Sequence, residues 1–465
     1  MNMINVRRLT VMTFLGAGML SGISAQVSPL QVDTLEETKI PDQWDLQSCI
    51  DYAKEQNITI RKNRITAVST QIDVKTAKAA MFPSLSFSTG QQVVNRPYQE
   101  TSSRVSGSEI ISSNSKTSYN GNYGLNASWT LYNGNKRLKT IQQEKLNNQM
   151  AELDVATSEN NIQESITQVY IQILYAAESV KVNENTLQVS IAQRDRGQEL
   201  LNAGSIAKSD LAQLEAQVST DRYQLVTAQA TLEDYKLQLK QLLELDGENE
   251  MNIYLPALSD ENVLAPLPTK RDVYISALSL RPEIEASKLN VEASELGINI
   301  AKSSYFPTIS LSAGIGTNHT SGSDFTFGEQ VKNGWNNSIG LSVSVPIFNN
   351  RQTKSAVQKA KLQYETSILS LLDEQKALYK TIESLWLDAN SAQQRYAAAN
   401  EKLKSTQISY ELISEQFNLG MKNTIELLTE KNNLLQAQQE QLQAKYMAIL
   451  NTQLLKFYQG DQLAI

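Results

Sequence analysis

Cysteine and histidine are almost absent from this chain of 465 residues, which has one of each, Cys49 and His319. A single cysteine cannot form an internal disulfide. A Cys/His metal site or a histidine-based catalytic triad has almost nothing from which to be built. We therefore expect no catalytic residues, no metal and no cofactor. Cys49 lies in a helical pattern and is expected to be a small buried thiol, whereas His319, within the polar stretch 317–328, is expected to be solvated.

Long hydrophobic runs are missing as well. The apolar segment 9–23 follows Arg7 and Arg8 and precedes Ser24-Ala25. At about 15 residues it is shorter than the roughly 20 that a membrane-spanning helix needs. The pattern predicts a signal peptide over residues 1–25 and an exported mature protein.

Positive charge is in slight deficit, and the formal net charge is −7. Removal of the two arginines of the signal peptide would lower it from −7 to −9. This acidity argues against nucleic acid as a partner, because nucleic-acid binding depends on clustered basic residues.

The ten prolines leave long uninterrupted stretches. Six segments predict helices: Gln43–Ala80, Asn135–Asn202, Ser205–Leu245, Arg271–Ser304, Gln352–Asn418 and Met421–Phe457. Ser205 or Ser209 is available to cap the third, and Pro282 is expected as a first-turn residue or a kink in the fourth. A helix of about 68 residues is roughly 100 Å long. Few large side chains line these helices, so we expect a coiled-coil-like wall that is solvated on both faces.

Four segments alternate apolar side chains with small polar ones, mostly Ser, Gly, Asn and Thr. They are residues 84–94, 119–131, 308–317 and 335–347. Each has about ten residues, the length of a tilted strand that crosses an outer membrane with one face toward lipid. A soluble sheet with one buried face is the alternative, which the absence of Lys and Glu at the polar positions disfavours. The stretches between paired strands, Asn95–Ser118 and Thr317–Gly334, are expected to be exposed loops.

The chain contains two copies of one architectural half. Three segments return: Phe82-Pro83 as Phe306-Pro307, Leu131-Tyr132-Asn133 as Ile347-Phe348-Asn349, and Leu201–Gly204 as Phe417–Gly420. The last two pairs share one offset, the one that separates Gly204 from Gly420. A repeat this long indicates a duplicated half and not a solenoid of short units. The predicted layout is a first repeat over 26–246, a proline-containing linker over 247–270 and a second repeat over 271–465.

Because each half supplies two strands, the chain supplies four. A four-stranded sheet in lipid leaves two edges of unpaired backbone groups, each costing several kcal/mol, and known closed membrane barrels have at least eight strands. The chain is therefore expected to assemble. Two copies would give eight strands and a nearly filled interior, and three would give twelve and room for a pore.

The duplicated order of helix, strand pair, long helix, glycine tip and returning helix resembles the TolC-type outer-membrane factor family. The matching segments are Phe82-Pro83, Phe306-Pro307, Leu131–Gly134, and Phe417–Gly420 with Ile425–Leu428. The resemblance covers the chain from about Trp44. It implies a mainly α-helical fold with membrane β-structure. In that fold a homotrimer forms a twelve-stranded β-barrel in the outer membrane of a Gram-negative bacterium, continuous with a periplasmic α-helical tunnel.

The resemblance also implies a function. A duct of this family docks to a periplasmic membrane-fusion adaptor and an inner-membrane pump, and it passively exports small molecules. The outer-membrane component of a type I protein secretion system stays open as an alternative, because the pump selects the cargo. A secreted coiled-coil structural protein would explain the helices but not the four strands.

Gly204 and Gly420 lie where a long helix ends and the next begins, a position that suits a left-handed turn. The resemblance implies that these tips close the periplasmic mouth and contact the adaptor, and Phe417, beside the second tip, is expected to take part in that contact.

The resemblance further implies acidic residues at the mouth. Glu426 matches the first of the family's two acidic pore sites, whereas the second falls on Thr429, which is not acidic. Asp210 occupies the position of Glu426 in the first half. Three copies of Glu426 around an axis would attract cations, and Lys422 and Lys208 are candidates for ion pairs that hold a closed state. A solvated carboxylate at a helix start is the alternative for Glu426.

Overall fold

The computed structural model describes residues 41–98, 102–106, 109–113, 116–246, 251–256, 263–321, 323 and 325–463. The predicted signal peptide 1–25 lies outside these residues, as do parts of the predicted linker 247–270. The chain divides into two units, Met1–Asp42 and Gln43–Ile465. All the elements described below belong to the second unit.

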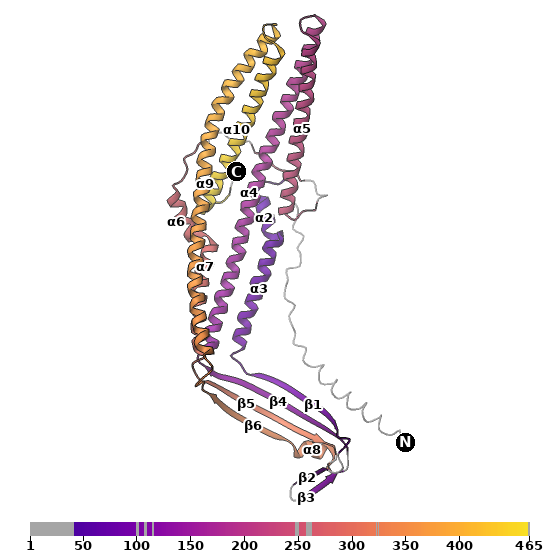
Figure 1. Ribbon diagram of the computed structural model, residues 1–465, viewed down its shortest axis with the longest axis vertical. Coiled ribbons are helices and arrows are strands. Elements are labelled where there is room, and N and C mark those ends of the chain that lie inside the picture. Colours follow the sequence, from indigo (N-terminus) through magenta and orange to yellow (C-terminus); the bar gives the residue numbers. More distant parts are fainter. Residues whose placement is uncertain are drawn as a thin grey trace, which may run out of the picture. The chain divides into compact units, whose positions relative to one another are not determined.

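The main helices come in matched pairs from the two halves of the chain (Figure 1). They are α2 (Leu46–Gln56), α3 (Ile58–Ala79), α4 (Lys136–Asn202), α5 (Lys208–Leu242), α6 (Lys270–Leu280), α7 (Pro282–Ser303), α9 (Gln352–Asn418) and α10 (Thr424–Gln459). α4 and α9 each have 67 residues, so the two halves match in the length of their longest helices as well as in order. Among the described helices, none combines the length and the apolar character that a bilayer crossing requires.

The spacing of the helix starts is also repeated. α9 and α10 follow α4 and α5 at the offset that separates Gly204 from Gly420. α6 and α7 follow α2 and α3 at a slightly larger offset, and this offset is the same for both pairs. Each position in a helix of the first half therefore has a defined counterpart in the second.

Two of the predicted helices are each divided into two. Asn57 has an extended backbone, with ψ 126°, and its side chain accepts two backbone N–H groups of α3 as an N-cap. Arg281 is likewise extended, with ψ 124°, and Pro282 is the first residue of α7. One continuous helix over Gln43–Ala80 or over Arg271–Ser304 is therefore wrong. In the first case, Asn57 caps the start of a new helix. In the second, Pro282 disfavours a helical backbone at Arg281, so α6 ends there and α7 begins at the proline.

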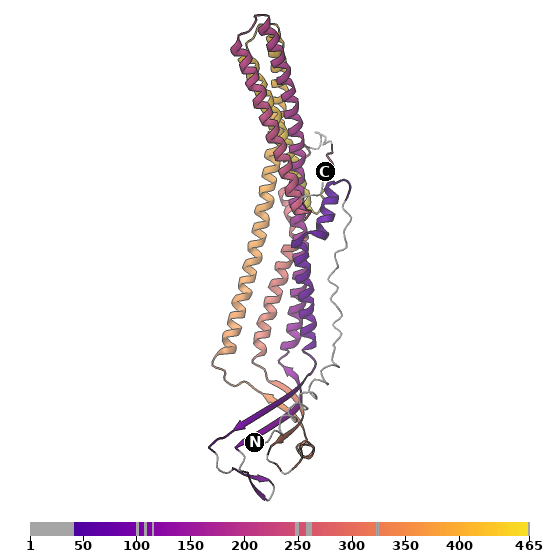
Figure 2. The same ribbon diagram turned by 90° about the vertical axis from the view of Figure 1, so that its right-hand side faces the viewer.

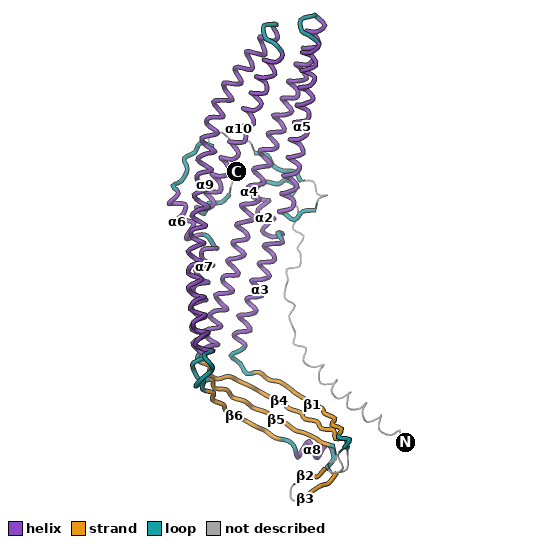
Figure 3. The backbone as a smooth tube through the Cα atoms, viewed as in Figure 1, coloured by secondary structure: helices purple, strands orange, loops and turns teal. Residues whose placement is uncertain are grey.

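The four main strands form one antiparallel sheet in the order β1-β4-β5-β6. They are β1 (Ser84–Asn95), β4 (Thr117–Asn133), β5 (Thr308–Thr320) and β6 (Asn336–Ser344). Each half contributes two adjacent strands, and β1 and β6 are the edges. The sheet lies at one end of the unit and the helical tips at the other, as the strands in Figure 3 and the turned view in Figure 2 show.

The strand register sorts the sheet into an apolar and a polar face. Cross-strand partners share a face, and one row contains Leu85, Ala127, Ala313 and Ile339. The neighbouring row contains Ser86, Asn126, Gly314 and Ser338. Leu85 is 69% and Ile339 is 79% exposed, so no part of the described chain covers the apolar face at the sheet edges.

The segments predicted to be exposed loops contain secondary structure. A hairpin of β2 (Ser102–Ser106) and β3 (Glu109–Ser113) lies within the first. The short helix α8 (Phe327–Asn333) lies within the second and begins with a capping box between Thr326 and Glu329. Thr-x-x-Glu is a helix-start signal, and its presence in a polar stretch explains the difference from the prediction.

His319 is not solvated as predicted, because only 8% of it is exposed. Its ring lies 5.3 Å from that of Tyr119, 5.9 Å from that of Tyr123 and 5.0 Å from that of Phe327, between ring centroids. Across the ladder it faces Gly121, which has no side chain to compete for the space. The strand alternation sets the face on which His319 lies, and that face is the apolar one.

The largest apolar cluster joins α2 to α4, α5 and α10. Trp44, Tyr170 and Leu239 belong to it, each at most 1% exposed. Cys49 is fully buried in the same cluster, which confirms the prediction of a buried thiol. Burial raises the pKa of this thiol to about 12, so it stays protonated at neutral pH.

Candidate functional site

Both helical tips are built around a left-handed glycine. Gly204 has φ +74° and Gly420 has φ +75°. After each glycine the next N–H returns to the helix end: Ser205 N to Leu200 O and Met421 N to Gln416 O, both 2.8 Å. A Cβ at either glycine would meet no atom within 4 Å. These positions therefore require glycine for the backbone angle and not for space.

Glu426 lies in the first turn of α10, beyond the second tip. Its carboxylate accepts a hydrogen bond from Lys422 Nζ at 2.6 Å and one from Asn423 N at 3.2 Å. In return Asn423 Oδ1 accepts from Glu426 N at 2.9 Å, which completes a capping box. The hydrogen bond from Lys422, followed by the one from Asn423, holds the pKa of Glu426 below its usual range. The carboxylate is therefore ionised at neutral pH.

The first tip has a carboxylate at the matching position but no such ion pair. Asp210 accepts from Ala207 N at 3.0 Å, and Lys208 is exposed without an ion pair among the described residues. Ile206 takes the place that Lys422 has in the second half. Lys208 is only two residues before Asp210, and residues two apart do not face each other on a helix.

The predicted serine cap of α5 is also absent. The residue at the N-cap position is Ala207, and its backbone N–H donates to the Asp210 carboxylate. Ser205 lies two residues before the capping position. Ser209 lies inside the first turn, past the capping position.

Phe417 is only 3% exposed, so its ring is buried within the chain. The apolar side chains that this tip exposes are Leu419 at 73%, Met421 at 63% and Ile425 at 62%. Thr429, at the second acidic position of the family, is exposed and donates to Ile425 O at 2.8 Å.

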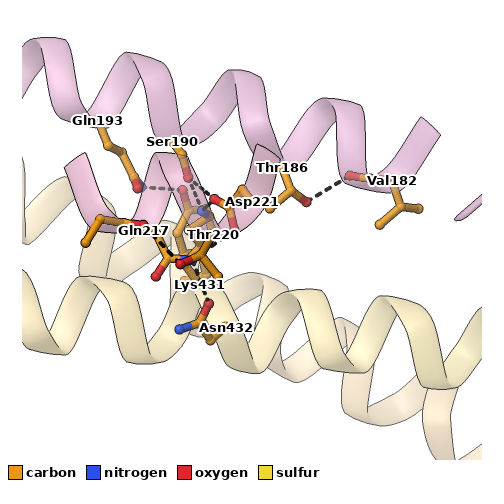
Figure 4. Close-up of polar contacts among 11 residues, drawn as sticks. Val182, Thr186, Ser190, Gln193, Gln217, Thr220, Asp221, Lys431 and Asn432 are labelled. Atoms are coloured by element: carbon orange, nitrogen blue, oxygen red, sulfur yellow. Dashed lines mark hydrogen bonds and ion pairs between the residues drawn. The ribbon is translucent and has the colours of Figure 1, made fainter. Parts of the chain in front are cut away.

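A buried polar cluster joins the two helical hairpins farther from the tips (Figure 4). Lys431 of α10 donates to Asp221 of α5 and to Ser190 of α4. Lys431 is 3% and Asp221 is 2% exposed. Burial lowers the pKa of Lys431, and the hydrogen bond and charge of Asp221 oppose this shift.

Two further polar contacts run between the hairpins near this cluster. Gln217 Nε2 of α5 donates to Asp221 Oδ1 at 2.9 Å and to Asn432 Oδ1 of α10 at 3.3 Å. Gln193 Nε2 of α4 donates to the hydroxyl of Tyr410 in α9 at 2.8 Å. The contacts of Gln217 with Asn432 and of Gln193 with Tyr410 each join the two halves. The contact of Gln217 with Asp221 lies within α5 and holds the Asp221 carboxylate in place.

This cluster was not predicted, although the sequence contains a signal for it. Asp221 follows Leu214 and Val218 at helical spacing, and Lys431 lies between Leu427 and Leu434 in the same way. A charged residue on the apolar stripe of a helix is the sign of a buried, paired charge.

A second buried ion pair joins the halves at the break between α6 and α7. Arg281, 6% exposed, donates to Glu164 of α4 at 2.6 Å and to Glu283 at 3.1 Å. Its guanidinium also lies 3.9 Å from the ring centroid of Tyr458 in α10. One arginine thus fixes the start of α7 to two long helices.

Comparisons with known proteins agree with this architecture. The sequence pattern of the family described as "Outer membrane efflux protein" matches residues 49–244 and 273–460. The outer membrane efflux protein BepC of Brucella suis biovar 1 is 24% identical over 299 residues, which cover 64% of this chain and 62% of BepC. TolC of Escherichia coli K12 is 24% identical over 291 residues, covering 61% of this chain and 58% of TolC. The aligned parts thus span about three fifths of these relatives.

The fold is also that of solved outer-membrane channels. A crystal structure of CusC is similar with a TM-score of 0.75 at 18% identity, and the alignment covers 90% of this chain and 92% of that one. At this level of identity the similarity establishes a shared arrangement of helical hairpins and strands.

Proposed function

Because the chain belongs to the outer membrane efflux protein family, we propose that it is a passive, non-enzymatic exit duct of a tripartite efflux system. It carries small molecules from the periplasm or from a pump to the outside. The protein is located in the outer membrane of a Gram-negative bacterium, with its long helices in the periplasm. The observation that carries the proposal is the uncovered apolar face of a sheet at one end of long helical hairpins.

The proposed assembly is a homotrimer. β1 and β6 are edge strands, and unpaired strand edges are not tolerated in lipid. Pairing of β1 of one copy with β6 of the next would remove both edges. Three copies would close twelve strands around a pore. The barrel would be continuous with a helical tunnel, to which the repeats 26–246 and 271–465 contribute their long helices, with the linker 247–270 between the repeats.

The proposed partners are a periplasmic membrane-fusion adaptor and an inner-membrane pump. The tips at Gly204 and Gly420 are the proposed adaptor contacts. Phe417, which is buried next to the second tip, would act by supporting that tip. The proposed gate residues are Glu426, paired with Lys422, at the second tip, and Asp210, the counterpart of Glu426, with Lys208 at the first tip. In a trimer these groups would set the charge at the periplasmic mouth.

Two measurements test the proposal together. The protein mass in detergent, with the detergent contribution subtracted by light scattering, should correspond to three chains. The same particles should produce discrete single-channel currents in a planar bilayer. A monomer that stays stable in detergent and carries no current would contradict the duct and favour a helical protein with a small packed sheet.

A further inference from the structure

We propose that basic residues at the junction between the helices and the sheet form a collar that binds the headgroups of anionic phospholipids in the membrane leaflet facing the periplasm. The inference rests on the proposed duct, because that duct places the apolar face of the sheet in lipid. The basic collar comprises the C-terminal ends of α3 and α7 and the N-terminal ends of α4 and α9, with the residues that join them to the strands. Its four segments are 74–83, 134–139, 298–307 and 347–354.

The four segments carry charge of one sign only. They contain no aspartate or glutamate, although the whole chain has a formal net charge of −7. Their basic residues are Lys75, Lys78, Lys136, Arg137, Lys139, Lys302, Arg351 and Lys354. None of these side chains forms an ion pair within the described part of the chain. Arg137 donates to Ala80 O at 2.7 Å and Lys139 to Asn299 O at 3.4 Å, whereas the other basic side chains are exposed.

The stability of the helices does not account for these charges. The start of a helix carries a partial positive charge, so it favours acidic residues and disfavours basic ones. α5, α6, α7, α8 and α10 each have an acidic residue in the first turn. α4 and α9, the two long helices that begin at the sheet, have none. Lys136 and Arg137 stand at the start of α4 and Lys354 at the start of α9. An anion bound from outside the chain would offset the repulsion at these positions.

The basic collar lies at the level where the lipid-facing surface of the sheet ends. Trp129 belongs to the apolar face, in one row with Leu311 and Leu341. Its ring N–H donates to Met81 O at 2.8 Å, just past the end of α3. A tryptophan with its body on an apolar surface and its polar tip bonded is typical of the boundary between lipid tails and water. Lys78 lies about one helical turn before this carbonyl, so its long side chain can extend into the headgroup layer.

The second half repeats this arrangement. The offset that carries α3 to α7 also carries Lys78 to Lys302 and Phe82 to Phe306. Phe82 is 73% and Phe306 is 51% exposed. Each half therefore places a lysine about one turn before an uncovered aromatic ring. In the proposed trimer this combination would recur in both halves of every copy, all around the barrel.

A bilayer surface fits the basic collar better than a soluble anion does. The charges are spread over the ends of four helices and lie next to exposed aromatic rings, as charged headgroups lie next to apolar tails. Clusters of lysine and arginine beside a membrane-embedded segment attract anionic lipids, and salt weakens the attraction. The same lysines facing the lumen would instead draw anions into the duct, and the experiment must separate these two cases.

The test uses the protein reconstituted in phosphatidylcholine vesicles that contain a small fraction of spin-labelled phosphatidylglycerol. Electron paramagnetic resonance measures how much labelled lipid is held at the protein surface, and the same label on phosphatidylcholine gives the reference. The collar variant is K78Q/K136Q/K302Q/K354Q. The matched control, K62Q/K181Q/K376Q/K380Q, removes exposed lysines of α3, α4 and α9 that lie away from the sheet.

The unmodified protein and the control should hold phosphatidylglycerol roughly twofold or more over phosphatidylcholine, and the collar variant should lose this preference. Salt provides an arm that needs no variant to assemble. Raising it from 0.1 M to 1 M should remove most of the preference in the unmodified protein, because the Debye length falls from about 10 Å to about 3 Å.

Three results overturn the inference alone: no preference in an unmodified protein that forms conducting trimers, a preference that salt leaves unchanged, or equal preference in the collar variant and the control. In the last case, a reversal potential shifted toward cation selectivity in the collar variant would place these lysines in the lumen. A protein that holds no lipid at its surface and carries no current overturns the proposed duct, and the inference with it.

Discussion

Lys431 of α10 and Asp221 of α5 form an ion pair whose side chains are only 4% and 2% exposed. By contrast, the pair between Arg196 and Glu199 on the surface of α4 has side chains 47% and 68% exposed. The two pairs are similar in chemistry, but their environments differ. Their energetic contributions should differ accordingly, because a charge buried without a partner is far costlier than one in water.

The first prediction concerns the stability of the hairpin contact. Asp221→Ala leaves Lys431 buried and unpaired and should lower the free energy of unfolding by about 3–5 kcal/mol. Asp221→Leu combined with Lys431→Met removes both charges and should restore most of that loss. Urea unfolding of the detergent-solubilised protein, followed by helical circular dichroism, measures both. Glu199→Gln is the surface control, expected to cost no more than about 1 kcal/mol; an equal loss in Asp221→Ala and the control would contradict the prediction.

The second prediction separates backbone angle from space at the tips. Gly420→Ala places a side chain at φ +75° with nothing nearby to clash with. It should destabilise the tip by about 1–2 kcal/mol through backbone strain alone. Gly328→Ala is the control, because Gly328 also has open space but lies in α8 without a positive φ. Amide hydrogen exchange at the tip should be faster in Gly420→Ala than in the unmodified protein, and unchanged in Gly328→Ala. Equal exchange at the tip in the two variants would show that the turn does not need glycine.

The long helices and the strand alternation were readable from the sequence because both depend on local periodicity. α9 begins and ends at the predicted residues Gln352 and Asn418, and β1 and β5 begin where the alternation starts. The break at Asn57 was missed because it is one residue inside a strongly helical pattern. The break at Arg281 had a local signal, since Pro282 was expected as a first-turn residue or a kink and is the first residue of α7.

The polar clusters could not be derived in the same way. The partners of Lys431 are 210 and 241 residues away in the chain, and the sequence pattern does not give the rotation of one long helix against another. At the tips, glycine and the capping carboxylates follow local rules and were identifiable. The burial of Phe417 and of His319 depends on packing between elements, which local polarity does not report.

The third prediction concerns ion selectivity at the second tip. Glu426→Gln removes a carboxylate near the proposed mouth and should lower the ratio of cation to anion permeability by roughly twofold. Lys422→Gln removes the neighbouring positive charge and should raise that ratio. Reversal potentials under a salt gradient in a planar bilayer measure the change. Unchanged reversal potentials in both variants would remove these residues from the conduction path.

Acidity should affect this site only at low pH. The pKa of Glu426 lies below its ordinary value of 4.5, first because of the hydrogen bond from Lys422. A carboxylate whose folded-state pKa is lowered contributes stability above the unfolded pKa, and that contribution is lost as pH falls through the folded value. Selectivity should therefore be constant from pH 8 to about pH 5. A change centred near neutral pH would point to another group.

The last prediction concerns the contact between His319 and Gly121 at the outer end of the sheet. A Cβ at Gly121 would lie 2.1 Å from Cε1 of the His319 ring, so Gly121→Ala must displace that ring from its place among Tyr119, Tyr123 and Phe327. Overpacking of this kind costs about 1–3 kcal/mol, and the sheet should unfold at a lower temperature in a heat-modifiability gel. His319→Ala alone should also destabilise the sheet, because it removes the aromatic contacts.

The double variant of these two residues distinguishes a local clash from a general effect on the strand. With His319→Ala in place, Gly121→Ala should cost much less than it does alone, because the added Cβ then enters the space that the ring has left. Gly340→Ala is the matched control: its Cβ would meet only the Ser312 hydroxyl, at 3.1 Å, which can rotate away. Purely additive losses in the double variant would mean that the ring has no part in the requirement for glycine at this position. The clash would then be with Gln91, whose Oε1 would lie 2.7 Å from the same Cβ.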